Sequence, residues 1–395
     1  MTGDMKTPNS KRRTALVTRW WSGRWRVRFL LIGTLGIVAN GATPARQRNP
    51  THVAQSGETK SLHRIQPFFQ RGIAFTQERW RNGGGYASPQ IGAALAPLKR
   101  LGVNAISVSP FAFMPGPSSP ELIRFRGESD DGVVNAISQA RGLGLKVMLK
   151  PQIWLRGGFY SGNIHFDNAQ DRARWFANYQ EWILHYALLA EQNHADLFCV
   201  GNELGEMVQD EHEWRELIAA VRRIYHGPIT YAAHWGGEFE TLEFWDELDY
   251  IGLNNYYPLT NYPLSQSTER EGSKPDSALQ KAAEEVVHRV EAVQQRFGRP
   301  LIFTEAGFPS RRGGLREPWN DRGTAVADMQ EQARGYEAVF RAFYAKPWFY
   351  GMYWWKWYST GEGGGPDDAS MTPMNKPAAA VMSQWYLSPQ RKRQE

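Results

Sequence analysis

Short apolar runs alternate with longer amphipathic stretches along most of this chain. The runs are rich in Val, Ile, Leu and aromatic residues, which is typical of strands buried on both faces of a parallel sheet. Eight runs are predicted to be strands, at residues 72–76, 105–109, 146–154, 197–203, 229–233, 250–254, 301–305 and 350–355. The stretches between them predict helices at residues 88–101, 131–143, 171–192, 213–225, 278–297 and 325–343.

This alternation is typical of repeated strand–helix units around a parallel sheet. No change of composition interrupts residues 68–388, and we expect these residues to form a single (β/α)8 TIM barrel. A doubly wound open sheet is the alternative. That fold normally has a glycine-rich phosphate turn after its first strand, and the glycines at 83–85 lack the required spacing.

Composition narrows the class of protein. The chain of 395 residues is 42% hydrophobic and 13% aromatic, which is enough for a large core. Its formal charge of +6 is concentrated in residues 1–45, which hold eight Lys or Arg residues and one acidic residue. The remainder is nearly neutral and lacks the basic surface of a nucleic-acid-binding protein. Cys199 is the only cysteine, so an intrachain disulfide and a Cys-based metal cluster are excluded.

The N-terminus is typical of an export segment. A basic region leads into an apolar run at 29–39 and then into small residues at 40–45. We expect residues 1–45 to be a signal peptide or an uncleaved membrane anchor, and residues 46–67 to be a linker. The protein is then exported, to the periplasm or beyond, and contacts a membrane only through this segment if it is retained. Residues 389–395 form a basic tail, and the protein is expected to be a monomer.

Two glutamates stand at strand ends and indicate the chemistry. Glu203 ends the fourth predicted strand and Glu305 ends the seventh, and a glycine follows each closely. Catalytic groups of (β/α)8 barrels lie at the carboxyl ends of the strands. A pair of carboxyl groups there indicates glycoside hydrolysis. Alternatively, each glutamate could be a structural carboxylate bonded to a helix N-terminus or to an arginine.

Several motifs resemble glycoside hydrolase family 113, and they occur in order over most of residues 72–357. They are Leu149-Lys-Pro-Gln-Ile-Trp154, His165-Phe-Asp167, Trp182-Ile-Leu-His-Tyr186, Asp196-Leu-Phe-Cys-Val-Gly-Asn-Glu-Leu204, Asp249-Tyr-Ile-Gly-Leu-Asn-Asn-Tyr-Tyr-Pro-Leu-Thr260, Thr304-Glu-Ala-Gly-Phe-Pro-Ser310, Glu317-Pro-Trp319 and Gly351-Met-Tyr-Trp-Trp-Lys-Trp357. The resemblance implies a retaining enzyme with acid/base Glu203 and nucleophile Glu305. It also implies no cofactor, with β-1,4-mannan as the substrate class. The sequence itself leads us to expect no metal site. Gln152 departs from the family pattern, where His often follows Lys-Pro, and this difference bears on sugar specificity.

Aromatic residues near the strand ends are candidates for stacking on sugar rings. Trp354 and Trp355 end the eighth strand, where alternation allows only one of them to face the barrel mouth. Trp235 follows the fifth strand and Trp154 ends the third. Relatives with this barrel place a phenol beside the nucleophile, and here Tyr256 and Tyr257 are equal candidates.

Polar residues beside these strand ends complete the predicted site. Asn202 precedes Glu203 and is expected to bind a sugar hydroxyl. Lys150 lies inside an otherwise apolar run, which indicates a place in the cleft. His234 is expected either to bind a sugar hydroxyl or to be a structural histidine. With Gln152, these residues form the predicted polar contacts to a polysaccharide or oligosaccharide.

Two other functions remain open from the sequence. One is a carbohydrate-binding barrel without turnover, which the presence of both carboxylates and Asn202 disfavours. The other is a hydrolase or transglycosylase that acts on a different β-glycan. The sequence does not distinguish endo from exo cleavage, because this depends on whether the loops form a groove or a pocket.

Overall fold

The computed structural model describes residues 67–77, 85–124, 129–260, 275–321 and 326–389. The predicted export segment at 1–45 lies outside the described residues, and so does nearly all of the predicted linker and basic tail. No helix among the described residues is long and apolar enough to cross a membrane.

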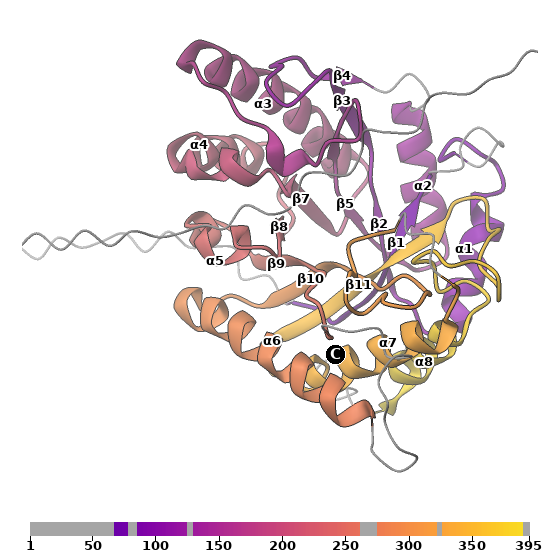
Figure 1. Cartoon of the computed structure of the whole chain (residues 1–395). Coiled ribbons are helices and arrows are strands. Elements are labelled where there is room, and N and C mark those ends of the chain that lie inside the picture. Colours follow the sequence, from indigo (N-terminus) through magenta and orange to yellow (C-terminus); the bar gives the residue numbers. More distant parts are fainter. Residues whose placement is uncertain (1–66, 78–84, 125–128, 261–274, 322–325, 390–395) are drawn as a thin grey trace, which may run out of the picture. The chain divides into compact units, whose positions relative to one another are not determined.

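Eight parallel strands close into a barrel in the part of the chain that the structure describes (Figure 1), which confirms the predicted (β/α)8 fold. Their order around the barrel is β1, β11, β10, β9, β8, β7, β5 and β2. The bounds are Gln70–Thr76 for β1, Ala105–Val108 for β2, Lys146–Leu149 for β5, Leu197–Asn202 for β7, Ile229–His234 for β8, Tyr250–Asn255 for β9, Leu301–Ala306 for β10 and Phe349–Tyr358 for β11. Every predicted run contributes a barrel strand.

The predicted run at 146–154 forms two strands. Its first part is β5, and its second part is β6, Gln152–Leu155, which leaves the barrel after Pro151. There β6 pairs with β3, Phe111–Met114, and β3 also pairs with β4, Ile123–Arg124. This three-stranded sheet extends the barrel beyond β2 and β5, at the end where their carboxyl termini lie. It therefore brings the side chains of β6 to the rim of the barrel mouth.

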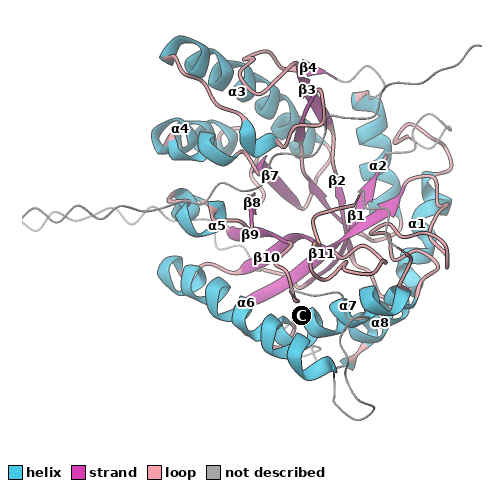
Figure 2. Ribbon diagram, viewed as in Figure 1, coloured by secondary structure: helices cyan, strands magenta, loops and turns pink. Residues whose placement is uncertain are grey.

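Helices surround the barrel (Figure 2). Each amphipathic stretch forms one of them, whereas the helices at residues 238–241 and 377–387 were not predicted. Three of the helices begin at side-chain caps that satisfy free backbone N–H groups. Ser129 accepts from Gly132, Asn168 from Asp171 and Asp328 from Glu331. The helices are α1 Ile91–Arg100, α2 Asp130–Gly142, α3 Ala169–Gln192, α4 Glu211–Arg222, α5 Glu238–Thr241, α6 Pro275–Phe297, α7 Met329–Phe343 and α8 Pro377–Leu387.

The barrel interior is packed with buried side chains. Alternate residues of the strands point inward and form one apolar cluster, which includes Met148, Leu197, Cys199, Ile302 and Tyr353. The intervening residues, such as Phe198 and Val200, belong to the larger core beneath the helices. Because the interior is filled, the barrel axis offers space for a ligand only at its ends.

Candidate active site at the carboxyl end of the barrel

Glu203 follows the last residue of β7 and has an unusual backbone conformation. Its φ of 51° lies in the left-handed region, which costs a residue with a side chain about 1–2 kcal/mol. Neighbouring groups hold the backbone there. The N–H of Glu203 donates to the carbonyl of Ala232 on β8 at 2.9 Å, and its carbonyl accepts from the Ser161 hydroxyl at 2.9 Å. The side chain is thereby directed into the barrel mouth.

Glu305 is the fifth residue of β10, and its carboxylate is buried. It forms an ion pair with Lys150, which follows β5 directly. Gln152 Nε2 donates to the same oxygen, Oε1, at 3.2 Å. The hydroxyl of Tyr256 donates to the other oxygen, Oε2, at 2.8 Å. Lys150 follows β5, Gln152 begins β6 and Tyr256 follows β9, and together these donors fix the orientation of the carboxylate.

Asn254 on β9 connects the two glutamates, and sequence reasoning did not select it. Its Nδ2 donates to Glu203 Oε1 at 2.9 Å and to Asn202 Oδ1 at 3.1 Å. The hydroxyl of Thr304 donates to Asn254 Oδ1 at 2.8 Å, which fixes the orientation of the amide. Lys150 Nζ lies 3.3 Å from Asn202 Oδ1 and completes the connection to Glu305. The signal in the sequence is a polar residue that ends an apolar run.

The two carboxyl groups occupy different electrostatic environments. Burial, and then the negative charge of Glu305, raises the pKa of Glu203 to about 8 from the ordinary value of 4.5. Lys150 and the bond from Asn254 oppose this shift but do not cancel it. Glu203 is therefore largely protonated at neutral pH, while Glu305 is paired with a buried ammonium group. Carboxyl groups in such different environments are suited to separate acid and nucleophile roles.

Both glutamates line one cleft of about 240 Å³ at the barrel mouth. Predicted residues that also line it are Asn202, Gln152, Trp154 and Trp355. The loop after β6 adds Phe159, Tyr160 and Ser161, which sequence reasoning missed. Their signal is the stretch Gly157-Gly-Phe-Tyr160, in which two aromatic residues follow two glycines.

The sequence matches Glycoside Hydrolase Family 113 over residues 75–364. The chain belongs to this family. The match confirms the resemblance that the motifs indicate. It also establishes the protein as a glycoside hydrolase of the endo-β-mannanase-like type.

Solved structures of the family superpose on the chain. The β-mannanase AaManA from Alicyclobacillus acidocaldarius, in complex with ManMIm, has a TM-score of 0.70 and 29% identity, covering 81% of this chain and 97% of its own. A family 113 β-1,4-mannanase in complex has a TM-score of 0.69 and 28% identity, covering 81% and 99%. The β-glucuronidase of Ruminococcus gnavus, at 16% identity and a TM-score of 0.53 over 81% of this chain and 50% of its own, shares the fold. No curated protein matches the sequence.

In this family 113 chain, Trp354 and Trp355 have opposite orientations. Trp354 is fully buried and stacks on Tyr336 of α7, with ring centroids 3.6 Å apart and planes 10° from parallel. Trp355 lines the cleft, and Lys150 Nζ lies 5.6 Å from its ring centroid. The sequence allows only one of this pair of candidate substrate contacts to face the mouth, and in the structure Trp355 lines the cleft while the alternative, Trp354, does not. The alternation of side chains along β11 turns its ring toward the helices.

The two candidate tyrosines have different hydrogen-bond partners. Tyr256 bonds to Glu305, whereas the hydroxyl of Tyr257 donates to Glu240 at 2.8 Å. Of the pair, the structure therefore brings Tyr256 to the predicted nucleophile. Tyr257 packs against Trp235 instead, with ring centroids 5.4 Å apart.

His234 and Trp235 lie beside the cleft, at and after the end of β8. Burial lowers the pKa of His234 to about 4, so the ring is neutral at pH 7, and its Nδ1 accepts the N–H of Gly236 at 2.9 Å. The His234 ring lies between Tyr160 and Trp235, at centroid distances of 5.1 and 5.4 Å. Trp235 in turn stacks on Trp319 at 5.1 Å. These four side chains, Tyr160, His234, Trp235 and Trp319, are called the aromatic strip below.

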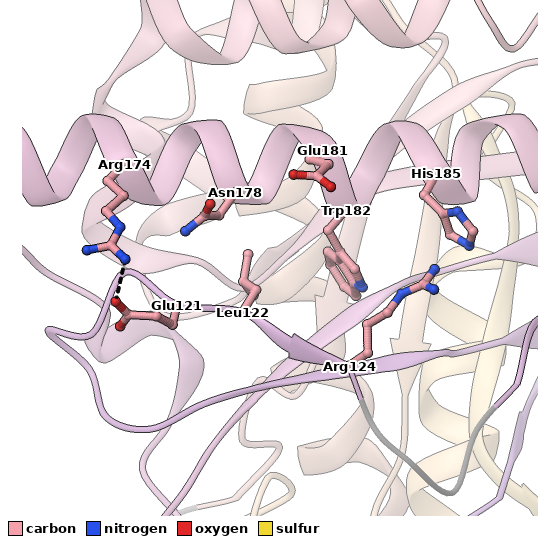
Figure 3. A pocket seen from close by; sticks show the side chains of 8 residues that line it. All are labelled: Glu121, Leu122, Arg124, Arg174, Asn178, Glu181, Trp182 and His185. Atoms are coloured by element: carbon pink, nitrogen blue, oxygen red, sulfur yellow. Dashed lines mark ion pairs between the residues drawn. The ribbon is translucent and has the colours of Figure 1, made fainter.

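A second cavity, of about 520 Å³, lies between one face of α3 and residues 121–124 (Figure 3). Arg174 Nη2 and Glu121 Oε1 form an ion pair across it at 3.0 Å, and His185 bonds to Asp130 nearby at 2.9 Å. None of the predicted catalytic or sugar-binding residues lines this cavity. Among the described residues, no group of three or more His, Cys, Asp or Glu side chains is placed to hold a metal ion.

Proposed function

We propose that this glycoside hydrolase cleaves β-1,4-mannan and retains the anomeric configuration through two successive displacements. The observation that carries the proposal is the pair of glutamates in one cleft, one protonated by its surroundings and the other ion-paired. The choice of mannan is supported by the family 113 neighbours at 28–29% identity, which are named as β-mannanases.

In the first displacement, a carboxylate oxygen of Glu305 attacks the anomeric carbon and the glycosidic bond breaks. Glu203 gives its proton to the departing oxygen, so the leaving sugar gains a hydroxyl and Glu203 becomes a carboxylate. A covalent glycosyl-enzyme forms on Glu305. General acid catalysis of this kind contributes about 10²- to 10⁴-fold to the rate.

In the second displacement, Glu203 takes a proton from water while the water oxygen attacks the same carbon. The bond to Glu305 breaks, and both carboxyl groups return to their first state. Two inversions at one carbon give net retention. Tyr256, Lys150 and Gln152 hold Glu305 for attack. Their three donors also stabilise it as the leaving carboxylate.

The aromatic strip supports action on an extended chain. The strip begins at Tyr160, which lines the cleft together with Glu203, and reaches Trp319, whose residue surface is 43% exposed. The leaving sugar must lie on the side of Glu203, because Glu203 protonates its oxygen. We propose that the strip binds sugars on this side by stacking, as Trp and Tyr rings do with amphipathic ligands. Such binding suits cleavage within a chain.

We also propose that the protein is exported. This proposal rests on residues 1–45, where a basic region precedes the apolar run at 29–39. The test is to sequence the N-terminus of the protein recovered from outside the producing cell. An N-terminus between residues 40 and 46 is expected, and protein found only in the cytoplasm contradicts export.

The test of function is the release of reducing ends from mannan, glucomannan, xylan and cellulose, with sizing of the products. The expected result is release from mannan and glucomannan as a mixture of oligosaccharides. The Glu305→Gln variant, which keeps the shape of the side chain, is expected to release none. Sugar binding without release from any glycan contradicts the proposal and favours a non-catalytic carbohydrate-binding barrel. Products longer than the substrate indicate a transglycosylase.

A further inference from the structure

The peptide group that follows Glu203 is held from both sides. Its carbonyl accepts a hydrogen bond from the Ser161 hydroxyl at 2.9 Å. Its N–H, which belongs to Leu204, donates to the hydroxyl oxygen of Tyr231 at 2.9 Å. This peptide sets the direction of the Glu203 side chain. The backbone of Glu203 has a left-handed conformation that it would leave without such support.

Tyr231 on β8 is itself immobile. It is fully buried, and its ring packs edge-on against Trp214 at 5.3 Å and Phe244 at 5.8 Å. Gly201, two residues before Glu203, allows this close approach, because a Cβ at that position would lie 2.5 Å from the Tyr231 ring. The ring of Tyr231 is therefore a rigid support from which its hydroxyl reaches the Leu204 N–H.

The hydroxyl of Tyr231 donates a hydrogen bond to a third buried carboxyl group, that of Glu238 on α5. The N–H of His234 donates to Glu238 Oε2 at 3.3 Å, and the backbones of Gly205 and Leu204 also bond to this carboxyl group. Glu238 has no direct hydrogen bond to the Glu203 side chain among those the structure records. Glu238 acts on the acid/base candidate through Tyr231 and the backbone, and its negative charge also helps to raise the pKa of Glu203.

We propose that Tyr231 and Glu238 are positioning residues that hold the Glu203–Leu204 peptide so that the Glu203 carboxyl meets the departing glycosidic oxygen. The inference rests on the proposed acid/base role of Glu203. The carboxyl of Glu238 accepts the Tyr231 proton, which leaves a hydroxyl lone pair to accept the Leu204 N–H. Without this acceptor the hydroxyl can turn and lose its bond to Leu204. A displacement of about 1 Å in a catalytic group costs on the order of 10²-fold in rate.

The test compares two substrates that differ in their need for an acid. Mannotetraose has a poor leaving group and requires protonation by Glu203, whereas 2,4-dinitrophenyl β-mannobioside has a leaving group that departs without it. In Tyr231→Phe, kcat/KM for mannotetraose is expected to fall about 10- to 100-fold. The same constant for the dinitrophenyl substrate is expected to stay within about threefold of wild type.

Glu238 is tested by a conservative and a disruptive change. Glu238→Gln keeps one oxygen that accepts the Tyr231 hydroxyl but sets an amide NH2 against the His234 N–H, so its kcat/KM for mannotetraose is expected to fall clearly less than that of Glu238→Ala. Glu238→Ala removes the acceptor and is expected to behave as Tyr231→Phe does. Tyr225→Phe is the matched control. It also deletes a buried hydroxyl, which donates to the Ala195 carbonyl at 2.7 Å, away from Glu203.

Three results would overturn the inference. Tyr231→Phe could lower kcat/KM for both substrates by the same factor, it could leave both unchanged, or Glu238→Gln could be as impaired as Glu238→Ala. The comparison of Glu238→Gln with Glu238→Ala tests the positioning role even if Tyr231→Phe does not fold. A wild-type protein that cleaves neither substrate contradicts the proposed function instead. The two failures are therefore distinguishable.

Discussion

At the scale of single residues, the site depends on the different hydrogen-bond and ion-pair partners of its two buried glutamates. Glu203 receives one amide donor from Asn254, whereas Glu305 receives a buried ammonium, an amide and a phenol. The sequence indicates which two glutamates matter, because each ends a buried strand. It does not indicate their environments, since the Lys150–Glu305 pair joins residues 155 positions apart. Only closure of the barrel brings such residues together.

The raised pKa of Glu203 predicts where activity ends at high pH. The acid works in its protonated form, and this form persists until the pH approaches the pKa of about 8. We therefore expect kcat/KM on mannan to fall as the pH rises through about 8, because Glu203 loses its proton there. Measurement of kcat/KM across acidic to alkaline buffers checks this. A fall that begins near pH 4–5, in the ordinary range of a glutamate, contradicts it.

Tyr256 and Tyr257 provide a matched pair of variants. Tyr256→Phe removes a hydrogen bond to the Glu305 carboxylate, and such bonds to charged groups are worth about 1.5–3 kcal/mol. A fall in kcat/KM on mannan of about 10- to 100-fold is expected. Tyr257→Phe removes a bond to Glu240 and is expected to stay near wild-type activity. Equal effects of the two changes would show that the Tyr256 bond does not serve the reaction.

At the scale of elements, strands were predicted better than the side chains at their ends. All eight barrel strands occur where apolar runs predict them, because a strand buried on both faces must be apolar throughout. The division of the run at 146–154 into β5 and β6 was missed, since both parts are apolar and the turn between them depends on pairing with β3. The strands β3 and β4 were also missed, because runs of four and two residues are too short to show a periodic pattern.

The strand β11 provides the clearest test of how side chains alternate between the two faces of a barrel strand. Trp354 is fully buried against α7, so Trp354→Ala is expected to lower the free energy of unfolding by about 3–5 kcal/mol. Trp355 lines the cleft, and Trp355→Ala is expected to lower kcat/KM on mannan with a smaller loss of stability. Denaturant unfolding and kinetics on both variants check this. The reverse pattern would mean that the orientation of β11 is wrong.

The aromatic strip predicts how the rate depends on the length of the oligosaccharide substrate. Trp319→Ala removes the exposed end of the strip, and kcat/KM is expected to fall about 3- to 10-fold for mannohexaose but little for mannotriose. Trp319→Phe keeps a ring and is expected to retain most of the rate. Trp348→Ala is the control. Trp348 directly precedes β11, at the end of the barrel opposite the active site, and its indole N–H donates to Glu291. The same loss for both oligosaccharide lengths contradicts binding by the strip.

At the scale of the whole molecule, one barrel explains why distant motifs act together. Its interior is filled by side chains, so chemistry is restricted to the mouth, where the strand ends meet. Family membership could be predicted because the motifs stand at these strand ends and occur in order. Asn254 ends an apolar run, which marks it as a candidate, but its partners and the support from Tyr231 could not be predicted, since these depend on neighbours from β7 and α5.

The most direct test of the central claim is proton NMR of the first products released from β-1,4-mannan, recorded before the anomers equilibrate. Attack by Glu305 followed by attack of water inverts the anomeric carbon twice. The β-anomer of the new reducing end is therefore expected to appear first, and the α-anomer to follow by mutarotation. Initial release of the α-anomer, or no release from mannan, would contradict this expectation.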